Sequence, residues 1–248
     1  MCAMNQRLLR PVVSGFNPKS ITGLVQWLDA SDTSTLTLSG SSVTTWADKS
    51  PQGMNATQTT ANNQPTTTTV NGKTAVLFDG VNDLMTFPGV NRTDETYIIA
   101  AAQTPHQTGD RSFLSDQNNG NGVGTVPSAV KLIDVSFGGF TEGVERLRIS
   151  YSATSTTPTG PLVLSAVRSS AGLFVFVDGT QRSSYVNGAT FGTAPKATTI
   201  KAVGGYASGT FNLSGWIGEV LCYDRALSAS DRNKIERYLG KKWGISVA

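Results

Sequence analysis

The C-terminal segment of this chain constrains its fold more than any other stretch. Trp216 to Tyr223 is an apolar run that only Gly218 and Glu219 interrupt, which is typical of a strand packed on both faces. Ser228 follows at an N-cap position with Asp231 three residues later, an arrangement close to a capping box. The segment therefore predicts one buried strand, a turn and a helix.

The helix that this segment predicts is short and amphipathic. Its apolar residues recur at i, i+3, i+4 and i+8 and form a single stripe, made of Ile235, Tyr238, Leu239 and Trp243. Because everything upstream is typical of β-structure, we expect this helix to close an all-β domain at its C-terminus.

Short apolar runs separated by polar or glycine-containing turns predict the strands of that domain. They cover residues 24–28, 43–46, 75–78, 97–102, 162–167, 173–177 and 198–203, with alternating patterns at 147–151 and in parts of 130–137. The polar stretch 57–69 is interpreted as an extended loop or edge strand, and 117–124 as a glycine-rich loop. Roughly a dozen strands at this spacing predict a two-sheet antiparallel β-sandwich of the jelly-roll type.

Charge and termini exclude several classes of protein. Twenty basic and 17 acidic residues leave a formal net charge of +3, too small to predict nucleic-acid binding. The N-terminus has no apolar run of signal-peptide length, and no stretch is long and apolar enough to predict a membrane span. Residues 1–20 lack periodicity and are predicted to be an arm or linker, with the sandwich domain at 21–248.

Five stretches resemble, in the same order, the laminin-G-like branch of the concanavalin A-like lectin/glucanase superfamily. They are residues 21–32, with the motif Trp27-Leu-Asp-Ala-Ser-Asp32, and residues 43–50, 76–83, 173–179 and 215–244. The resemblance implies two antiparallel sheets packed face to face, one of them concave. Copies that begin with this motif resemble domains of bacteriophage virion proteins and bacterial surface proteins, which implies binding or assembly more than catalysis.

Catalytic patterns are not found in the sequence. Retaining glycoside hydrolysis needs two carboxyl groups about 5–5.5 Å apart, which on a strand means the same face. The best strand-like pair, Glu142 and Glu145, stands at i and i+3 and therefore points to opposite faces. The single histidine, His106, lies in a polar stretch and is interpreted as a solvated loop residue. We therefore predict that the chain is not an enzyme.

A calcium site is the one metal site that the sequence leaves open, and no other cofactor is expected. Asp79, Asn82 and Asp83 bring three oxygen-bearing side chains together in five residues, and Asp29 with Asp32 offers two more. Calcium prefers such ligands. The alternative interpretation is that these residues form turns at strand ends.

Aromatic and basic side chains are the candidates for binding. The four tryptophans follow the core pattern, whereas aromatic residues in or near loops are candidates for sugar contacts, namely Phe137, Phe140, Tyr151, Tyr185 and Tyr206. The basic candidates for docking on an acidic partner are Arg7, Arg10, Arg232, Lys241 and Lys242. A solvated helix face is the alternative for those on the helix.

These observations predict a non-enzymatic structural protein of a bacteriophage particle, either a capsid decoration or cement protein or a fibre-associated component. Its expected partners are other virion proteins, further copies of itself and a host-surface glycan. Without a signal peptide it would be made in the host cytoplasm and end in the virion. The alternative is a carbohydrate-binding, lectin-like adhesion module of a bacterial or phage surface protein.

Overall fold

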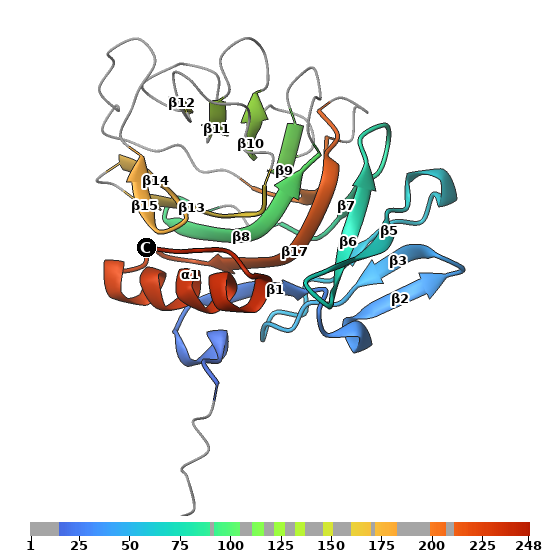
Figure 1. Ribbon diagram of the computed structural model, residues 1–248, viewed down its shortest axis with the longest axis horizontal. Helices are drawn as coiled ribbons and strands as arrows, with labels where there is room; N and C mark the ends of the chain where they lie inside the picture. Colours follow the sequence, from blue (N-terminus) through green and yellow to red (C-terminus); the bar gives the residue numbers. More distant parts are fainter. Residues whose placement is uncertain are drawn as a thin grey trace, which may run out of the picture.

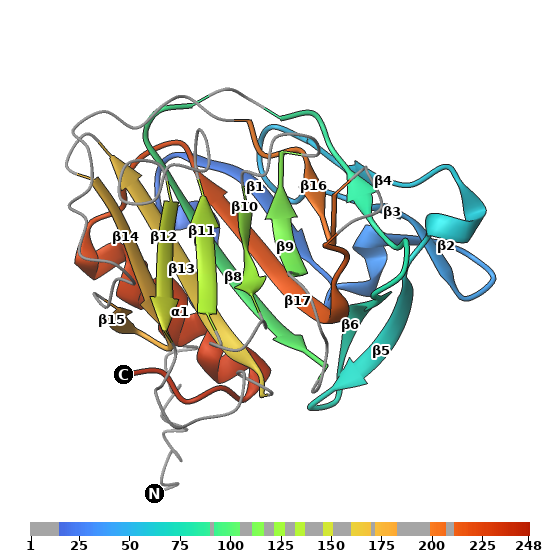
Figure 2. The same ribbon diagram turned by 90° about the horizontal axis from the view of Figure 1, so that it is seen from above.

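The computed structural model describes residues 15–89, 92–104, 111–116, 122–126, 132–136, 146–150, 160–169, 172–182, 199–206 and 211–248. They form an antiparallel β-sandwich with one α-helix, α1 (Ala229–Trp243), packed outside it (Figure 1). Figure 2 shows the strands of one sheet lying across those of the other. The predicted fold class, an all-β sandwich closed by a C-terminal helix, is confirmed.

The sheet next to α1, called here the helix-side sheet, is built around two long central strands. Its strands, in spatial order, are β1 (Leu24–Asp29), β17 (Ser214–Tyr223), β8 (Glu95–Gln103), β13 (Leu162–Ser169), β14 (Gly172–Val177) and β15 (Thr180–Arg182). The hairpin predicted between 162–167 and 173–177 is β13–β14.

The opposite sheet, called here the far sheet, consists of shorter strands. In spatial order they are β12 (Arg146–Ser150), β11 (Leu132–Ser136), β10 (Gly122–Val126), β9 (Arg111–Ser115), β16 (Ala202–Val203), β7 (Met85–Thr86), β4 (Ala56–Thr57), β3 (Ser42–Trp46) and β2 (Leu36–Ser39). Two more strands, β5 (Thr66–Val70) and β6 (Lys73–Asp79), join the sheets, because β5 pairs with β3 and β6 with β17. Three short 3-10 helices complete the elements, at Pro18–Ser20, Thr33–Thr35 and Ala61–Asn63.

One difference from the predicted elements is β10, because residues 117–124 were expected to be a loop. Glycine weakens a strand by its entropy and lack of a side chain. Here Gly122–Val126 nevertheless pairs with β9 on one side and β11 on the other. Backbone hydrogen bonding on both sides therefore overrides the local preference.

Alternation along β8 divides the apolar residues between two cores. Ile99 and Ala101 face the far sheet and belong to the core between the sheets, whereas Ile98 and Ala100 face α1. Both sets are almost fully buried. The unbroken apolar run that predicted a central strand at 97–102 thus reflects a strand covered on both faces.

The helix packs as its stripe predicts. Ile235, Leu239 and Trp243 are fully buried in the core between α1 and the helix-side sheet, and Tyr238 is half-buried at its edge. Ser228 caps the helix by accepting a hydrogen bond from the backbone N–H of Asp231 at 3.1 Å.

Three of the four tryptophans are buried, as predicted, and the fourth departs from the expectation. Trp27, Trp46 and Trp243 are in the cores. Trp216 is only half-buried, and its ring lies against that of Trp243 with the centroids 5.8 Å apart.

Part of the segment predicted as an arm packs against the domain. Phe16 contacts the ring of Tyr238, with centroids 5.5 Å apart, and Pro18 is buried. The carbonyl of Pro18 accepts a hydrogen bond from the hydroxyl of Tyr223 at 3.1 Å. Arg7, Arg10 and the rest of residues 1–14 lie outside the described residues.

Candidate functional site

A bulge in β17 determines where the only charged side chain of that strand points. The pairing of β17 with β8 shifts between Ile217 and Glu219, so Gly218 is an extra residue. Ile217 faces the core between the sheets, and the extra residue turns Glu219 toward α1 instead of into that core. A side chain at Gly218 would collide with the Trp243 ring, since its Cβ would lie 2.5 Å from the ring.

Glu219 is fully buried, and both of its carboxylate oxygens have two partners. Oε1 accepts hydrogen bonds from Trp27 Nε1 at 2.7 Å and from the Tyr238 hydroxyl at 2.9 Å. Oε2 accepts from Lys242 Nζ at 2.6 Å and from Trp243 Nε1 at 3.3 Å. Glu219 therefore connects β1, β17 and α1, and its oxygens are occupied by protein donors.

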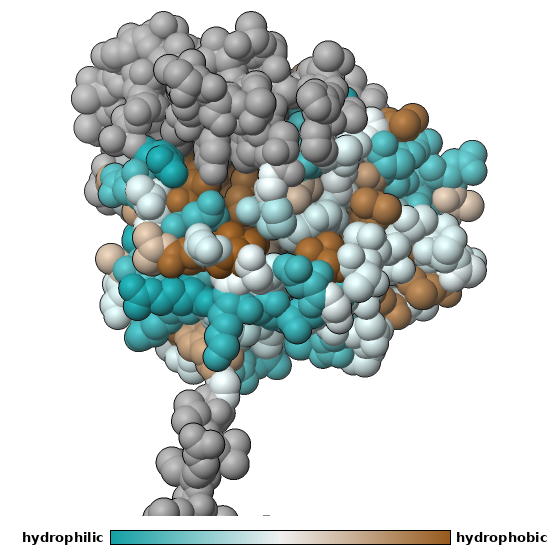
Figure 3. All heavy atoms as spheres, in the orientation of Figure 1, coloured by the Kyte–Doolittle hydropathy of each residue, from teal (hydrophilic) through white to brown (hydrophobic). Residues whose placement is uncertain are grey.

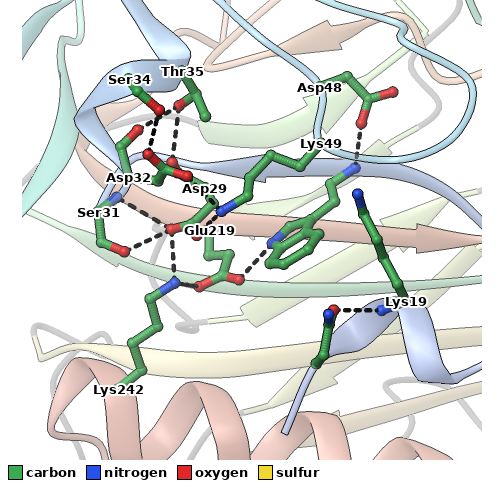
Figure 4. A network of polar contacts seen from close by, with 12 residues as sticks. Lys19, Asp29, Ser31, Asp32, Ser34, Thr35, Asp48, Lys49, Glu219 and Lys242 are labelled. Carbon is green, nitrogen blue, oxygen red and sulfur yellow. Dashed lines mark hydrogen bonds and ion pairs between the residues drawn. The ribbon is translucent and has the colours of Figure 1, made fainter. Parts of the chain in front are cut away.

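Two lysines hold the pair of aspartates that was a secondary candidate for cation ligation. Lys49 Nζ lies 3.0 Å from Asp29 Oδ2 and 2.8 Å from Asp32 Oδ2 (Figure 4). Lys242 Nζ reaches the other oxygen of Asp29 at 2.7 Å as well as Glu219. The ammonium groups thus supply the positive charge that these carboxylates face.

The two carboxylates that share Lys242 are both buried, but their pKa values shift in opposite directions. Burial raises the pKa of Glu219, and the charge of Asp29 adds to that rise, whereas Lys242 and Trp27 only partly oppose it. Burial acts in the same direction on Asp29, but Lys242, Ser31 and Lys49 outweigh it and hold its pKa below the usual value. The two lysines thus bridge three carboxylates, and we assign this network to holding α1 on the sheet.

The residues predicted as a calcium site form a tight turn between β6 and β7. Asp79 Oδ1 accepts the backbone N–H groups of Val81, Asn82 and Asp83 at 2.8, 3.3 and 3.3 Å. Asp83 Oδ2 accepts the N–H of Asp79 at 2.9 Å. This geometry favours the turn interpretation, and calcium binding stays a prediction. Within the described part of the chain, no group of three or more His, Cys, Asp or Glu side chains is arranged to hold a metal ion.

An aromatic pair, half-buried Tyr206 and exposed Phe211, lies next to this turn, where the chain enters β17. Tyr206 and Phe211 meet edge to face, with ring centroids 5.4 Å apart. Phe211 is 42% exposed and Val81, at the tip of the turn, is 69% exposed. Buried Asn212 connects them, since its side-chain amide donates to the carbonyl of Val81 at 2.6 Å. We call Val81, Tyr206 and Phe211 the aromatic rim.

The backbone under the aromatic rim is firmly held. Phe211 has a φ of 59°, a left-handed conformation that bulky residues rarely adopt. Its carbonyl accepts the N–H of Ser112 at 2.8 Å, and Leu213 N–H donates to the carbonyl of Gly204 at 2.7 Å. The fold therefore holds an apolar ring in solvent at a conformational cost, which is a feature of functional sites more than of packing.

Of the predicted sugar-binding residues, Tyr206 belongs to the aromatic rim. Phe137, Phe140, Tyr151 and Tyr185 lie outside the described residues, as do His106, Glu142 and Glu145. Phe211 and Val81 were missed by the sequence interpretation. Phe211 carries no local signal beyond its polar surroundings, and its exposure follows from contacts between distant segments.

The predicted docking residues on α1 separate into two groups. Arg232 is buried, which corrects the expectation that it faces a partner: its Nε lies 3.2 Å from Glu236 Oε1 and its guanidinium 3.4 Å from the centre of the Phe176 ring. Lys241 and Lys242 instead line an open groove beside α1. Figure 3 shows the hydrophilic surface that runs along this helix.

Comparisons with known proteins identify the fold of the chain but not a family. No protein-family model and no curated protein matches the sequence. Among solved structures, the chain is similar to domain 4 of AbnA, a GH43 extracellular arabinanase from Geobacillus stearothermophilus in complex with arabinotriose. The TM-score is 0.56 at 14% identity, over 87% of this chain and 98% of that domain.

Two toxin domains are similar as well. The binding domain of Paraclostridial Mosquitocidal Protein 1 matches with a TM-score of 0.56 at 12% identity, over 92% of this chain and 56% of that one. The receptor-binding domain of botulinum neurotoxin type G matches with a TM-score of 0.52 at 10% identity, over 88% and 51%. Trypanosoma rangeli sialidase matches with a TM-score of 0.51 at 15% identity, and the chain spans 33% of it. At 10–15% identity, the likeness to these four structures shows that the chain has a β-sandwich fold. Among the residues that the structure describes, no helix is long and apolar enough to cross a bilayer.

Proposed function

We propose that this chain is a non-catalytic carbohydrate-binding module, and that the aromatic rim is part of its ligand site. The observation that carries the proposal is Phe211, an exposed ring held in a left-handed backbone conformation against Tyr206. Aromatic faces pack against the apolar faces of sugar rings, and binding residues gather on loops that a rigid scaffold positions.

Two further observations support the proposal. The match to the arabinanase domain covers 98% of that domain, which has been solved in complex with arabinotriose. The buried carboxylates Glu219 and Asp29 are saturated by tryptophan, serine and lysine donors, so they are poorly placed to act as acid and nucleophile. These two observations support binding without catalysis.

The test replaces Phe211 by glycine, which accepts a φ of 59° without strain. We expect F211G to fold at least as stably as the wild type and yet to bind arabino-oligosaccharides, or another ligand found on a glycan array, about tenfold more weakly. The matched control is F174A, because Phe174 on β14 is 36% exposed but lies away from the rim. Calorimetric affinities that are equal for F211G and the wild type would refute the assignment of the rim.

A second proposed role is attachment to a larger particle, as a capsid decoration or fibre-associated protein of a bacteriophage virion. The resemblance of the Trp27–Asp32 motif to laminin-G-like virion domains supports it. One structural observation also favours it: Gly15, where residues 1–14 join the domain, borders the basic groove beside α1. Co-sedimentation with capsids or tails, which deletion of residues 1–14 should reduce, tests this role; loss of glycan binding in the same deletion would contradict the separation of the two sites.

A further inference from the structure

The groove beside α1 is formed by three segments that are distant in the sequence. It has a volume of about 720 Å³ and is open to solvent. The helix provides one side, Gly15 and Phe16 another, and Lys73 at the start of β6 a third. Its lining residues are Gly15, Phe16, Lys73, Lys234, Arg237, Tyr238, Lys241 and Lys242.

The charge of this groove is positive and largely uncompensated. Five of its lining residues are cationic and none is acidic. Lys242 is neutralised by Asp29 and Glu219, and Lys234 by Asp231 at 3.0 Å. Within the described part of the chain, the other three have no acidic partner within salt-bridge distance; they are Lys73, Arg237 and Lys241. An anionic ligand would therefore gain three ion pairs without breaking existing ones.

The donors and acceptors of the groove's side chains limit the chemical class of ligand that it can bind. Lysine and arginine side chains donate and cannot accept. The one hydroxyl, on Tyr238, already donates to Glu219 at 2.9 Å and accepts from Lys242 at 3.0 Å. Sugar hydroxyls need acceptors as well as donors, whereas carboxylates only accept. The side chains of the groove thus fit carboxylates better than a neutral sugar.

The floor of the groove is apolar. The rings of Phe16 and Tyr238, which both line the groove, lie with their centroids 5.5 Å apart. Hydrogen bonds to Glu219 hold the side chains of Tyr238 and Lys242 in place, so this part of the groove is formed before a ligand binds. A ligand that brings apolar side chains together with carboxylates would use both parts of the surface.

We propose that this groove binds an acidic, amphipathic segment of a partner protein. The N-terminal residues 1–14 are not complementary, because they contain Arg7 and Arg10 and no acidic residue. The inference goes beyond glycan binding at the aromatic rim and gives the attachment role a surface and a partner chemistry. It is tested with isolated peptides, so it can fail or hold independently of both proposed roles.

The probe is a short fluorescent peptide of glutamate and leucine, measured by anisotropy with the full chain. Two companion peptides carry glutamine in place of glutamate, or serine in place of leucine. We expect the glutamate–leucine peptide to bind most tightly and its affinity to fall as salt screens the charges. We expect R237E/K241E to weaken binding at least about tenfold, and K201E, at an exposed lysine beside β16, to change it less than about twofold.

The variant F16A tests the apolar floor. It should reduce the preference for the glutamate–leucine over the glutamate–serine peptide, a ratio that a general loss of stability would not change. Three outcomes would overturn the proposal: no binding of any peptide; a heparin fragment that binds more tightly than the peptides and is unaffected by F16A; or a wild-type chain that sediments as a dimer which R237E/K241E dissociates.

Discussion

At the scale of single residues, the turn between β6 and β7 contains a buried carboxyl group, that of Asp83, whose ionisation is unfavourable in the folded chain. The Asp83 carboxyl is buried, and burial together with the nearby Asp79 charge raises the pKa of Asp83 to about 6. Its one described stabilising contact is the backbone N–H of Asp79. A carboxyl that is harder to ionise in the folded than in the unfolded chain makes the protein less stable once it ionises.

The substitution D83N should remove this cost and its pH dependence. Between the unfolded pKa of 3.8 and the folded pKa of about 6, the folded wild type holds a proton that the unfolded chain has released. The proton bound to Asp83 therefore stabilises the folded chain relative to one with an ionised Asp83. This stabilisation is fully present below pH 3.8 and is lost as the pH rises through about 6. We expect D83N, whose amide oxygen can still accept the Asp79 N–H, to be more stable than the wild type at pH 7 by on the order of 1–3 kcal/mol, with the difference vanishing near pH 4. Urea unfolding at both pH values measures it, and a constant difference between them would contradict the assignment.

At the scale of elements, apolar packing and an ionic network attach α1 to the helix-side sheet. Lys242 from the helix binds Glu219 of β17 and Asp29 of β1. Removing only the lysine would leave Glu219 as an uncompensated buried charge, whereas removing both charges would not. A double-mutant comparison separates these effects.

We expect K242M to lower the free energy of unfolding by about 3–5 kcal/mol, because the Glu219 charge is fully buried. The double variant K242M/E219Q should lose less than K242M alone, since a neutral amide needs no counter-charge and can still accept from Trp27. Guanidinium unfolding of the wild type, both single variants and the double variant supplies the cycle. Additive losses would mean that the two groups do not interact.

How far the sequence predicts these elements depends on whether a feature is local. The apolar stripe of α1 and its cap at Ser228 involve neighbours along one helix, and both were predicted correctly. The partner of Glu219 in β1 is Trp27, 192 residues away in the sequence, and no local pattern predicts that pairing. Arg232 was interpreted as exposed for the same reason, because its contact with Phe176 exists only in the folded chain.

At the scale of the whole molecule, β17 connects the layers of the fold. It pairs with β1, β6 and β8, and successive side chains beyond its bulge serve different cores. Val220 belongs to the core between the sheets and Leu221 to the core beneath α1, and both are fully buried. If α1 or the far sheet detached, β17 would lose the packing on one of its two faces. The layers should therefore unfold together, although they have separate cores.

The variants V220A and L221A test this coupling. Each removes buried methyl groups from one core, and we expect L221A to cost about 2–5 kcal/mol and V220A somewhat less, because valine loses fewer methyl groups. In both variants, loss of helical far-ultraviolet circular dichroism should coincide with loss of the near-ultraviolet signal of the buried tryptophans, since Trp46 and Trp243 report on different cores. If L221A instead lost its helical signal at lower denaturant than its near-ultraviolet signal, α1 would be a separately folding layer. The groove beside α1 could then unfold independently of the aromatic rim. Coincident transitions would instead mean that both surfaces belong to one cooperatively unfolding unit.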